Sequence, residues 1–226
     1  MRLYPRWILA NGAAECLGLG ATLALGAWAA QRWPGIDETA GGVIGAALAA
    51  IAAGTLLEGV LLGACQAWAI RSAYPAFPAG AWVRATAIGA ALAWTAGMIP
   101  STVMNVAGDA ARGAAGSEPP LAVTLALAAA MGLVLGPFLG VPQGRVLRRF
   151  GGTVRRWVSA NSLAWAAGMP VVFIGTALVD EASGAARIAA VVIASTLGAG
   201  LVVGAVHGRF LPAFTPESIR GPSAST

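Results

Sequence analysis

The sequence predicts an all-α membrane protein with six transmembrane helices, arranged as three helical hairpins repeated in parallel, and with both termini in the cytoplasm. Three observations support this fold class. Of the 226 residues, 58% are hydrophobic and only 10% are charged, whereas soluble domains carry about 25% charged residues. The apolar residues gather in six stretches long enough for a bilayer, which needs about 20 residues per helix. Short motifs also return from one stretch to another.

The first predicted span covers residues 7–30. A cleavable signal peptide is the alternative, because arginines precede an apolar run and Ala-Trp-Ala stands at 27–29. The run is too long for a signal peptide, however, and it contains Glu15. Its opening residues also return near Trp157. We therefore expect a retained helix.

Five further spans follow in order, at residues 42–70, 85–105, 121–143, 157–179 and 188–206. Turn-forming residues separate all six spans, at Pro34-Gly35, Pro75 with Pro78, Gly108 to Pro120, Gly151-Gly152 and Gly184. The connections are short. Consecutive helices are therefore expected to pack as antiparallel neighbours.

The arginines determine the predicted orientation. All fourteen basic residues are Arg, and only Arg32, Arg112 and Arg187 fall on the side opposite the N-terminus. Eleven of the fourteen therefore lie on the side of the N-terminus. Because short cytoplasmic loops carry an excess of Lys and Arg, both termini are predicted to be cytoplasmic.

The even-numbered spans share a motif near their C-terminal ends. Two glycines four residues apart are followed, three residues later, by a polar side chain and then by an arginine: Gly59, Gly63, Gln66 and Arg71; Gly136, Gly140, Gln143 and Arg148; Gly200, Gly204, His207 and Arg209. Offsets of four and seven residues place the motif on one helix face. Such glycines can also serve only to let helices approach closely.

The odd-numbered spans repeat as well. The residues Trp7, Ala10, Asn11 and Gly18 return 150 positions later as Trp157, Ala160, Asn161 and Gly168. Residues 92–98 of the third span match residues 163–169 of the fifth. We therefore predict a quasi-threefold six-helix domain over 1–211, with repeats centred on 42–104, on 121–179, and on 188–210 together with 7–30. Residues 212–226 are predicted to be a disordered cytoplasmic tail.

On these motifs the chain resembles a group of uncharacterised bacterial multi-pass membrane proteins. The likeness lies in a Gly-rich helix that ends in Gln and Arg, over residues 59–71 and 136–149, and in a helix that opens with Trp, over 157–168. It implies a bacterial inner-membrane protein built of repeated hairpins, and it implies no activity. The chain departs from the repeat at His207 and at Glu58.

Glu15 and Glu58 are the ionisable residues inside the predicted spans. Burying such a residue costs roughly 2.5–3.5 kcal/mol, so it indicates a functional site. At 1.5 Å per residue, Glu15 lies roughly 12 Å in from Trp7 and Glu58 roughly 19 Å in from Arg71. Two facing carboxyl groups at mid-depth would share one proton and form a proton or cation site. The alternative is that each glutamate only fastens neighbouring helices.

Gln66, Gln143 and His207 occupy equivalent positions and are predicted to form a polar ring at one depth. Such a ring could line a vestibule or coordinate a solute. The alternative is hydrogen bonding between helices, worth about 0.6 kcal/mol for each bond. Asn11 and Asn161 are further candidates, with the same alternative.

The tryptophans fall into two predicted groups. The first group is expected in an aromatic belt at the membrane interfaces and consists of Trp7, Trp33, Trp82 and Trp157. The second group is expected to pack between helices and consists of Trp28, Trp68, Trp94 and Trp165.

Other classes of function are not indicated by the sequence. It has one His and no HExxH, Walker or CxxC motif, so neither an enzyme, nor a metal site, nor a cofactor is predicted. Cys16 and Cys65 are expected to be apolar packing residues. The arginines punctuate the spans and do not form a run, so nucleic acid is not an expected partner. The expected partners are the lipid bilayer and either a second copy of the chain or another membrane complex.

Two hypotheses for the function follow. In the first, the protein is a small transporter or channel for a proton, a cation or a small solute, which uses the two glutamates and the polar ring. In the second, it is a non-catalytic scaffold or an accessory subunit of a membrane complex, because Gly and Ala packing faces dominate the chain. A continuous, water-accessible cavity that reaches Glu58 would favour the first hypothesis, and a closed, dry bundle with satisfied carboxyl groups would favour the second.

Overall fold

The structure is a computed structural model that describes residues 3–107, 119–180 and 183–212. Every regular element in these residues is helical. In the described part of the chain, six helices are long and apolar enough to cross a membrane, which confirms the prediction of an all-helical chain compatible with a multi-pass membrane protein. The predicted tail lies outside the described residues, except for its first residue.

The helices run longer than the apolar stretches that predicted them. Their bounds are α1 Leu3–Arg32, α2 Ala40–Ala53, η2 Gly54–Gly59, α3 Val60–Arg71, α4 Ala79–Val106, α6 Leu121–Leu147, α7 Val154–Ala177 and α8 Ala185–His207. The second span joins α2 and α3 through η2, which is one turn of π-helix. Short 3-10 turns stand at Ile36–Glu38, Arg148–Phe150 and Gly208–Phe210. Thr39 and Thr153 cap the starts of α2 and α7.

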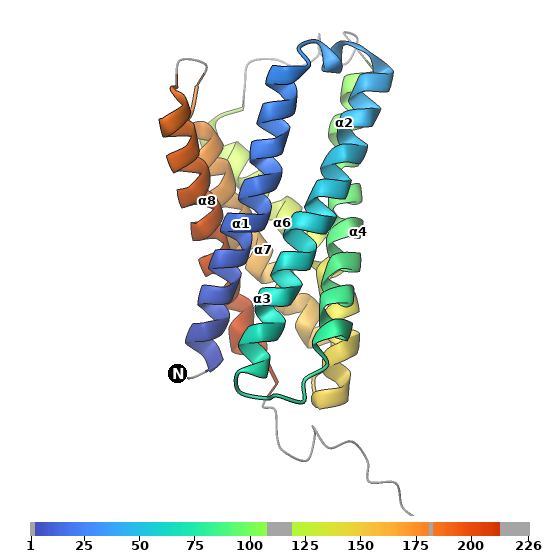
Figure 1. The fold of residues 1–226 in the computed structure, drawn as a ribbon, viewed down its shortest axis with the longest axis vertical. Coiled ribbons are helices and arrows are strands. Elements are labelled where there is room, and N and C mark those ends of the chain that lie inside the picture. Colours follow the sequence, from blue (N-terminus) through green and yellow to red (C-terminus); the bar gives the residue numbers. More distant parts are fainter. Residues whose placement is uncertain (1–2, 108–118, 181–182, 213–226) are drawn as a thin grey trace, which may run out of the picture.

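The helices run up and down along the long axis of one bundle (Figure 1), and their contacts form a closed ring in chain order. α1 packs against α3, α4 against α3 and α6, and α6 against α7, and the ring closes where α8 contacts both α7 and α1. Large apolar side chains such as Leu48, Leu127 and Val134 are exposed on the outside of this ring. Soluble monomers rarely expose large contiguous apolar patches, so this exterior suits a lipid environment.

The glycines of the repeated motif pack against the helix of the neighbouring odd-numbered span, that is, α4, α7 or α1. Gly63 contacts α4, Gly140 contacts α7 and Gly204 contacts α1. A Cβ atom on Gly140 would lie only 2.7 Å from the Cα of Val158. Of the two predicted roles for these glycines, the structure therefore shows close helix packing.

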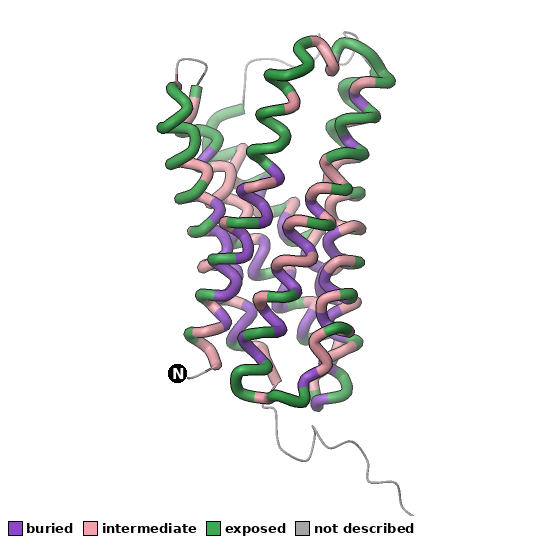
Figure 2. The backbone as a smooth tube through the Cα atoms, in the orientation of Figure 1, coloured by how far each residue is buried: buried purple, intermediate pink, exposed green. Residues whose placement is uncertain are grey.

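The two ends of the bundle differ in how tightly they are packed (Figure 2). We define the packed half as the half that holds the start of α1 and the ends of α3, α6 and α8; the rest is the open half. All buried residues of α1 lie between Trp7 and Thr22, that is, in or next to the packed half. α1 and α2 diverge toward the far end of the open half (Figure 1).

Candidate functional site

Three tryptophans meet at the centre of the packed half. Trp7 of α1, Trp82 of α4 and Trp157 of α7 contact one another edge to face, with ring centroids 6.3, 6.2 and 6.0 Å apart. Their side chains are at most 1% exposed. The predicted aromatic belt is therefore wrong for these three. The reason is that α1, α4 and α7 begin before the apolar runs do, so that each tryptophan lies within a helix and points inward.

The remaining tryptophans divide differently from the prediction. Trp28 and Trp68 were expected to pack between helices, but they are 56% and 61% exposed. This expectation was wrong because the faces of α1 and α3 that carry them point outward. Trp33 is exposed, as a belt residue should be, and Trp165 is buried as predicted.

Each central tryptophan donates a hydrogen bond to a residue of the predicted polar ring. Trp82 Nε1 donates to Gln66 Oε1, Trp157 Nε1 to Gln143 Oε1 and Trp7 Nε1 to His207 Nδ1, each over 3.0 Å. The two glutamines and the histidine are at most 2% exposed. The structure thus brings the three residues together, as the shared motif predicted.

A second layer of polar side chains follows each tryptophan by four residues. Asn11, Thr86 and Asn161 each donate to the backbone carbonyl of the tryptophan one turn earlier. Gln66 Nε2 in turn donates to Asn11 Oδ1 over 2.8 Å, and Gln143 Nε2 donates to Thr86 Oγ1 over 2.9 Å. We call the three tryptophans, Gln66, Gln143, His207 and these three residues the Trp–polar cluster.

Thr86 is a member of this cluster that the sequence analysis missed. A signal for it exists: Trp7, Trp82 and Trp157 follow one another at intervals of 75 residues, and Ala85-Thr86 stands where Ala10-Asn11 and Ala160-Asn161 stand. The match between residues 92–98 and 163–169 has an offset of 71. It differs from the tryptophan spacing by four residues, or about one helical turn.

The hydrogen bonds of the Trp–polar cluster connect helices around the ring, and no fully buried side-chain nitrogen or oxygen of the cluster lacks a partner. Such a satisfied network rigidifies a core. None of its members lines the cavity described below. Four of the predicted polar residues hydrogen-bond to another helix, namely Gln66, Gln143, His207 and Asn11. Asn161 bonds to the Trp157 carbonyl within α7.

Glu58 lies in the π-helix η2, between α2 and α3. π-Helical turns inside α-helices are frequent at functional sites. The carboxyl Oε2 of Glu58 accepts a hydrogen bond from Trp94 Nε1 of α4 over 3.0 Å. The missing side chain of Gly54 leaves room for the Trp94 ring against η2.

Glu15 lies on α1 and is 0% exposed. Neither of its carboxyl oxygens has a hydrogen-bond partner among the described residues. Gly200 of α8 packs against its Cβ and Cγ, and Gly18, one turn further along α1, packs against the backbone of Glu58. Glu15 thus lies at a helix interface beside Glu58. A carboxyl group in such apolar surroundings is stable only when it is protonated or has a cation beside it.

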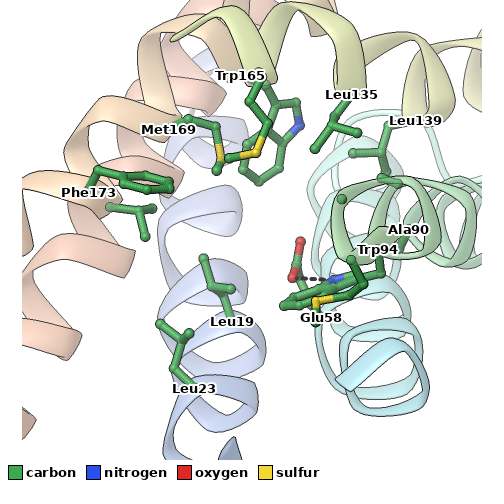
Figure 3. Close-up of a pocket in the computed structure, with 16 residues that line it drawn as sticks. Leu19, Leu23, Glu58, Ala90, Trp94, Leu135, Leu139, Trp165, Met169 and Phe173 are labelled. Atoms are coloured by element: carbon green, nitrogen blue, oxygen red, sulfur yellow. Dashed lines mark hydrogen bonds between the residues drawn. The ribbon is translucent and has the colours of Figure 1, made fainter. Parts of the chain in front are cut away.

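A cavity of about 250 Å³ lies between α1, η2, α4, α6 and α7 and reaches Glu58. Glu58 and Trp94 form one part of its wall, and Trp165 and Met169 form another (Figure 3). Glu15 does not line this cavity. Of the two predicted acids, one therefore faces a cavity and the other a helix interface.

Among the described residues, no group of three or more His, Cys, Asp or Glu side chains is placed to hold a metal ion. Cys16 and Cys65 are both free and partly buried. Comparison with known proteins found no match of this chain to any protein-family model, curated protein or solved structure.

Proposed function

We propose that this protein is a small transporter of the bacterial inner membrane, in which Glu58 binds the transported proton or cation. The observation that carries the proposal is the cavity that reaches Glu58 from within a ring of otherwise apolar helices. An ionisable residue that lines an intramembrane cavity is typical of ion pathways and proton relays. The π-helical turn at Glu58 is a second feature typical of a functional site.

Glu15 has a supporting role in this proposal. Its unpaired carboxyl group lies next to the helix contact that holds Glu58. Because no described residue donates a hydrogen bond to the Glu15 carboxyl group, a second negative charge beside Glu58 would be costly. Glu15 and Glu58 together therefore favour the binding of at least one proton or cation at this depth. A transporter that couples to protons requires such a site.

The proposed architecture is three helical hairpins related by a quasi-threefold axis along the membrane normal. In its support, the three central tryptophans are 75 residues apart, and each donates to the polar residue of one even-numbered span, on α3, α6 or α8. In this arrangement the axis passes through the Trp–polar cluster. Parallel repeats of this kind occur in transporters.

The proposed orientation places the packed half at the cytoplasmic side, because most arginines flank it. The Trp–polar cluster then closes the cytoplasmic side, and the cavity at Glu58 communicates with the opposite side through the open half. Transport would require the cluster to open in a second conformation. Closure of one side at a time is the principle of alternating access.

Proton flux into proteoliposomes tests the proposal. Purified protein is reconstituted with a pH-sensitive dye inside the vesicles, and a membrane potential drives protons inward. We expect flux well above that of empty vesicles and its loss in Glu58→Gln, because glutamine keeps the shape but cannot release a proton. Glu38→Gln is the matched control, since Glu38 is exposed between α1 and α2. Equal flux in wild type and Glu58→Gln would overturn the role of Glu58.

The second candidate is a scaffold or accessory subunit of a membrane complex. One observation favours it: the polar ring, for which a vestibule and hydrogen bonding between helices were the two alternatives, is a buried hydrogen-bond network that joins neighbouring helices. A scaffold predicts no flux above empty vesicles and predicts a partner that co-purifies from native membranes. The two candidates therefore give opposite results in the same proteoliposomes.

A further inference from the structure

We propose that the cavity at Glu58 binds a small hydrophobic organic monocation, an ammonium group attached to an apolar body. This inference deepens the proposed function, on which it rests, by naming the class of ligand for the same site. It follows from three properties of the cavity: one carboxyl group, two indole rings and an otherwise apolar wall.

The single acidic group of the cavity has one oxygen available to a ligand. Trp94 Nε1 donates a hydrogen bond to Oε2 of Glu58 over 3.0 Å. The other carboxyl oxygen points away from Trp94 and into the cavity (Figure 3). One carboxylate balances one positive charge, so the site suits a monocation.

The rest of the wall selects the body of the ligand. Apart from Glu58, the residues that line the cavity are aliphatic, aromatic, Met or Gly. Trp94 and Trp165 both line the cavity, and indole rings attract organic cations, particularly quaternary ammonium groups. Met98, Met131 and Met169 add flexible, polarisable side chains that adapt to ligands of different shape.

The same wall disfavours an inorganic cation. Calcium takes six to eight oxygen ligands and magnesium needs near-octahedral oxygen coordination, whereas this cavity supplies oxygen only from Glu58 among its side chains. An ion stripped of its water here would lack partners. In an organic cation, apolar groups are bonded covalently around the charge, so it loses much less hydration free energy than an inorganic ion on entering the cavity.

The size of the cavity limits the ligand. Its volume of about 250 Å³ is below the roughly 300–1,000 Å³ of pockets for drug-sized molecules. A compact cation with one ring, such as benzyltrimethylammonium, is therefore a suitable probe. Neopentylbenzene has the same shape with carbon in place of the charged nitrogen, and it serves as the neutral counterpart.

Isothermal titration calorimetry of the full chain in lipid nanodiscs tests the proposal, with empty nanodiscs subtracted. We expect benzyltrimethylammonium to bind about tenfold or more tightly than neopentylbenzene, which is the effect expected of one charge pair with ring contacts. Glu58→Gln should lose this preference, and Glu38→Gln should retain it. No binding of the cation, equal binding of both probes, or an unchanged preference in Glu58→Gln would each overturn the proposal.

A second variant keeps the test decisive if Glu58→Gln does not fold. Leu135→Phe leaves the carboxyl group in place and fills part of the cavity that Leu135 lines. It should weaken cation binding about tenfold or more, because a ligand of this size then lacks room. Unchanged binding in Leu135→Phe would place the ligand elsewhere and overturn the proposal.

The proposed function and this inference can fail separately. Proton flux that depends on Glu58, together with no preference for the cation, would remove the ligand class and leave the transport role. Glu58-dependent cation binding in a protein without flux would instead support the ligand and remove transport.

Discussion

Replacing Glu15 by methionine is expected to stabilise the protein. The side chain is 0% exposed, and both carboxyl oxygens lack hydrogen-bond partners among the described residues. In mutational data, burying a polar group without a hydrogen bond costs about 1–3 kcal/mol. Methionine has a similar length and no strong polar group, and it fits irregular gaps. The free energy of unfolding should therefore rise by about 1–3 kcal/mol.

The assay is equilibrium unfolding in mixed micelles, followed by tryptophan fluorescence. The three central tryptophans report on the packed half, since their rings contact one another in the native state. Glu58→Met is the matched control. It removes a carboxyl group that accepts the Trp94 hydrogen bond, and leaving this partly buried donor unpaired should reduce stability by about 1–3 kcal/mol.

The two variants are thus expected to change stability in opposite directions. A loss of stability in Glu15→Met of about 1 kcal/mol or more, a size typical of one net hydrogen bond, would refute the reasoning. It would show that the carboxyl group of Glu15 has a stabilising partner, such as a bound water or an ion.

Three further predictions concern packing and the Trp–polar cluster, each measured by the same unfolding assay. Gly140→Ala should destabilise the protein by about 1–3 kcal/mol, because its Cβ would crowd α7. Gly45 has open space where a Cβ would lie, so Gly45→Ala should be neutral or slightly stabilising. Equal changes in the free energy of unfolding for the two variants would contradict this explanation. Thr86→Val should cost about 1–3 kcal/mol by leaving the Gln143 amide without that acceptor, and Thr86→Ser should not. His207→Gln should stay within about 1 kcal/mol of wild type, since the other two repeats use glutamine; a larger loss would weaken the proposed repeat.

The six helices were predictable because length and apolar composition suffice to identify a span. The bounds of the helices were less predictable, since a helix can continue beyond its apolar stretch. α4 begins at Ala79, six residues before the predicted span, and this extension carries Trp82 into the core. An amino-acid pattern alone does not distinguish such a tryptophan from one in an aromatic belt.

The candidate site was predictable in its residues and only in part in its geometry. Glu15 and Glu58 stood out as acids in apolar spans. Their different surroundings depend on the rotation of α1, which the contacts of Gly18 and Gly200 determine. The π-helical turn at Glu58 and its bond to Trp94 are likewise set by tertiary packing, and neither leaves a pattern in the local sequence.

The most direct measurement for the central claim is the accessibility of the cavity from each side of the membrane. After replacement of Cys16 and Cys65 by alanine, a single cysteine is introduced at Ala93, which lines the cavity. A membrane-impermeant cationic thiosulfonate is then added to either side. Exposed positions Thr39 and Ser72, each changed to cysteine separately, identify the two sides.

The proposal predicts that Ala93→Cys reacts from the side on which Thr39→Cys reacts, and not from the side of Ser72→Cys. The reaction should slow in Glu58→Gln, because the carboxylate no longer attracts the cationic reagent. Reaction from the Ser72 side would show that the Trp–polar cluster does not close that half. Reaction from neither side would contradict the claim that Glu58 faces a cavity open to water.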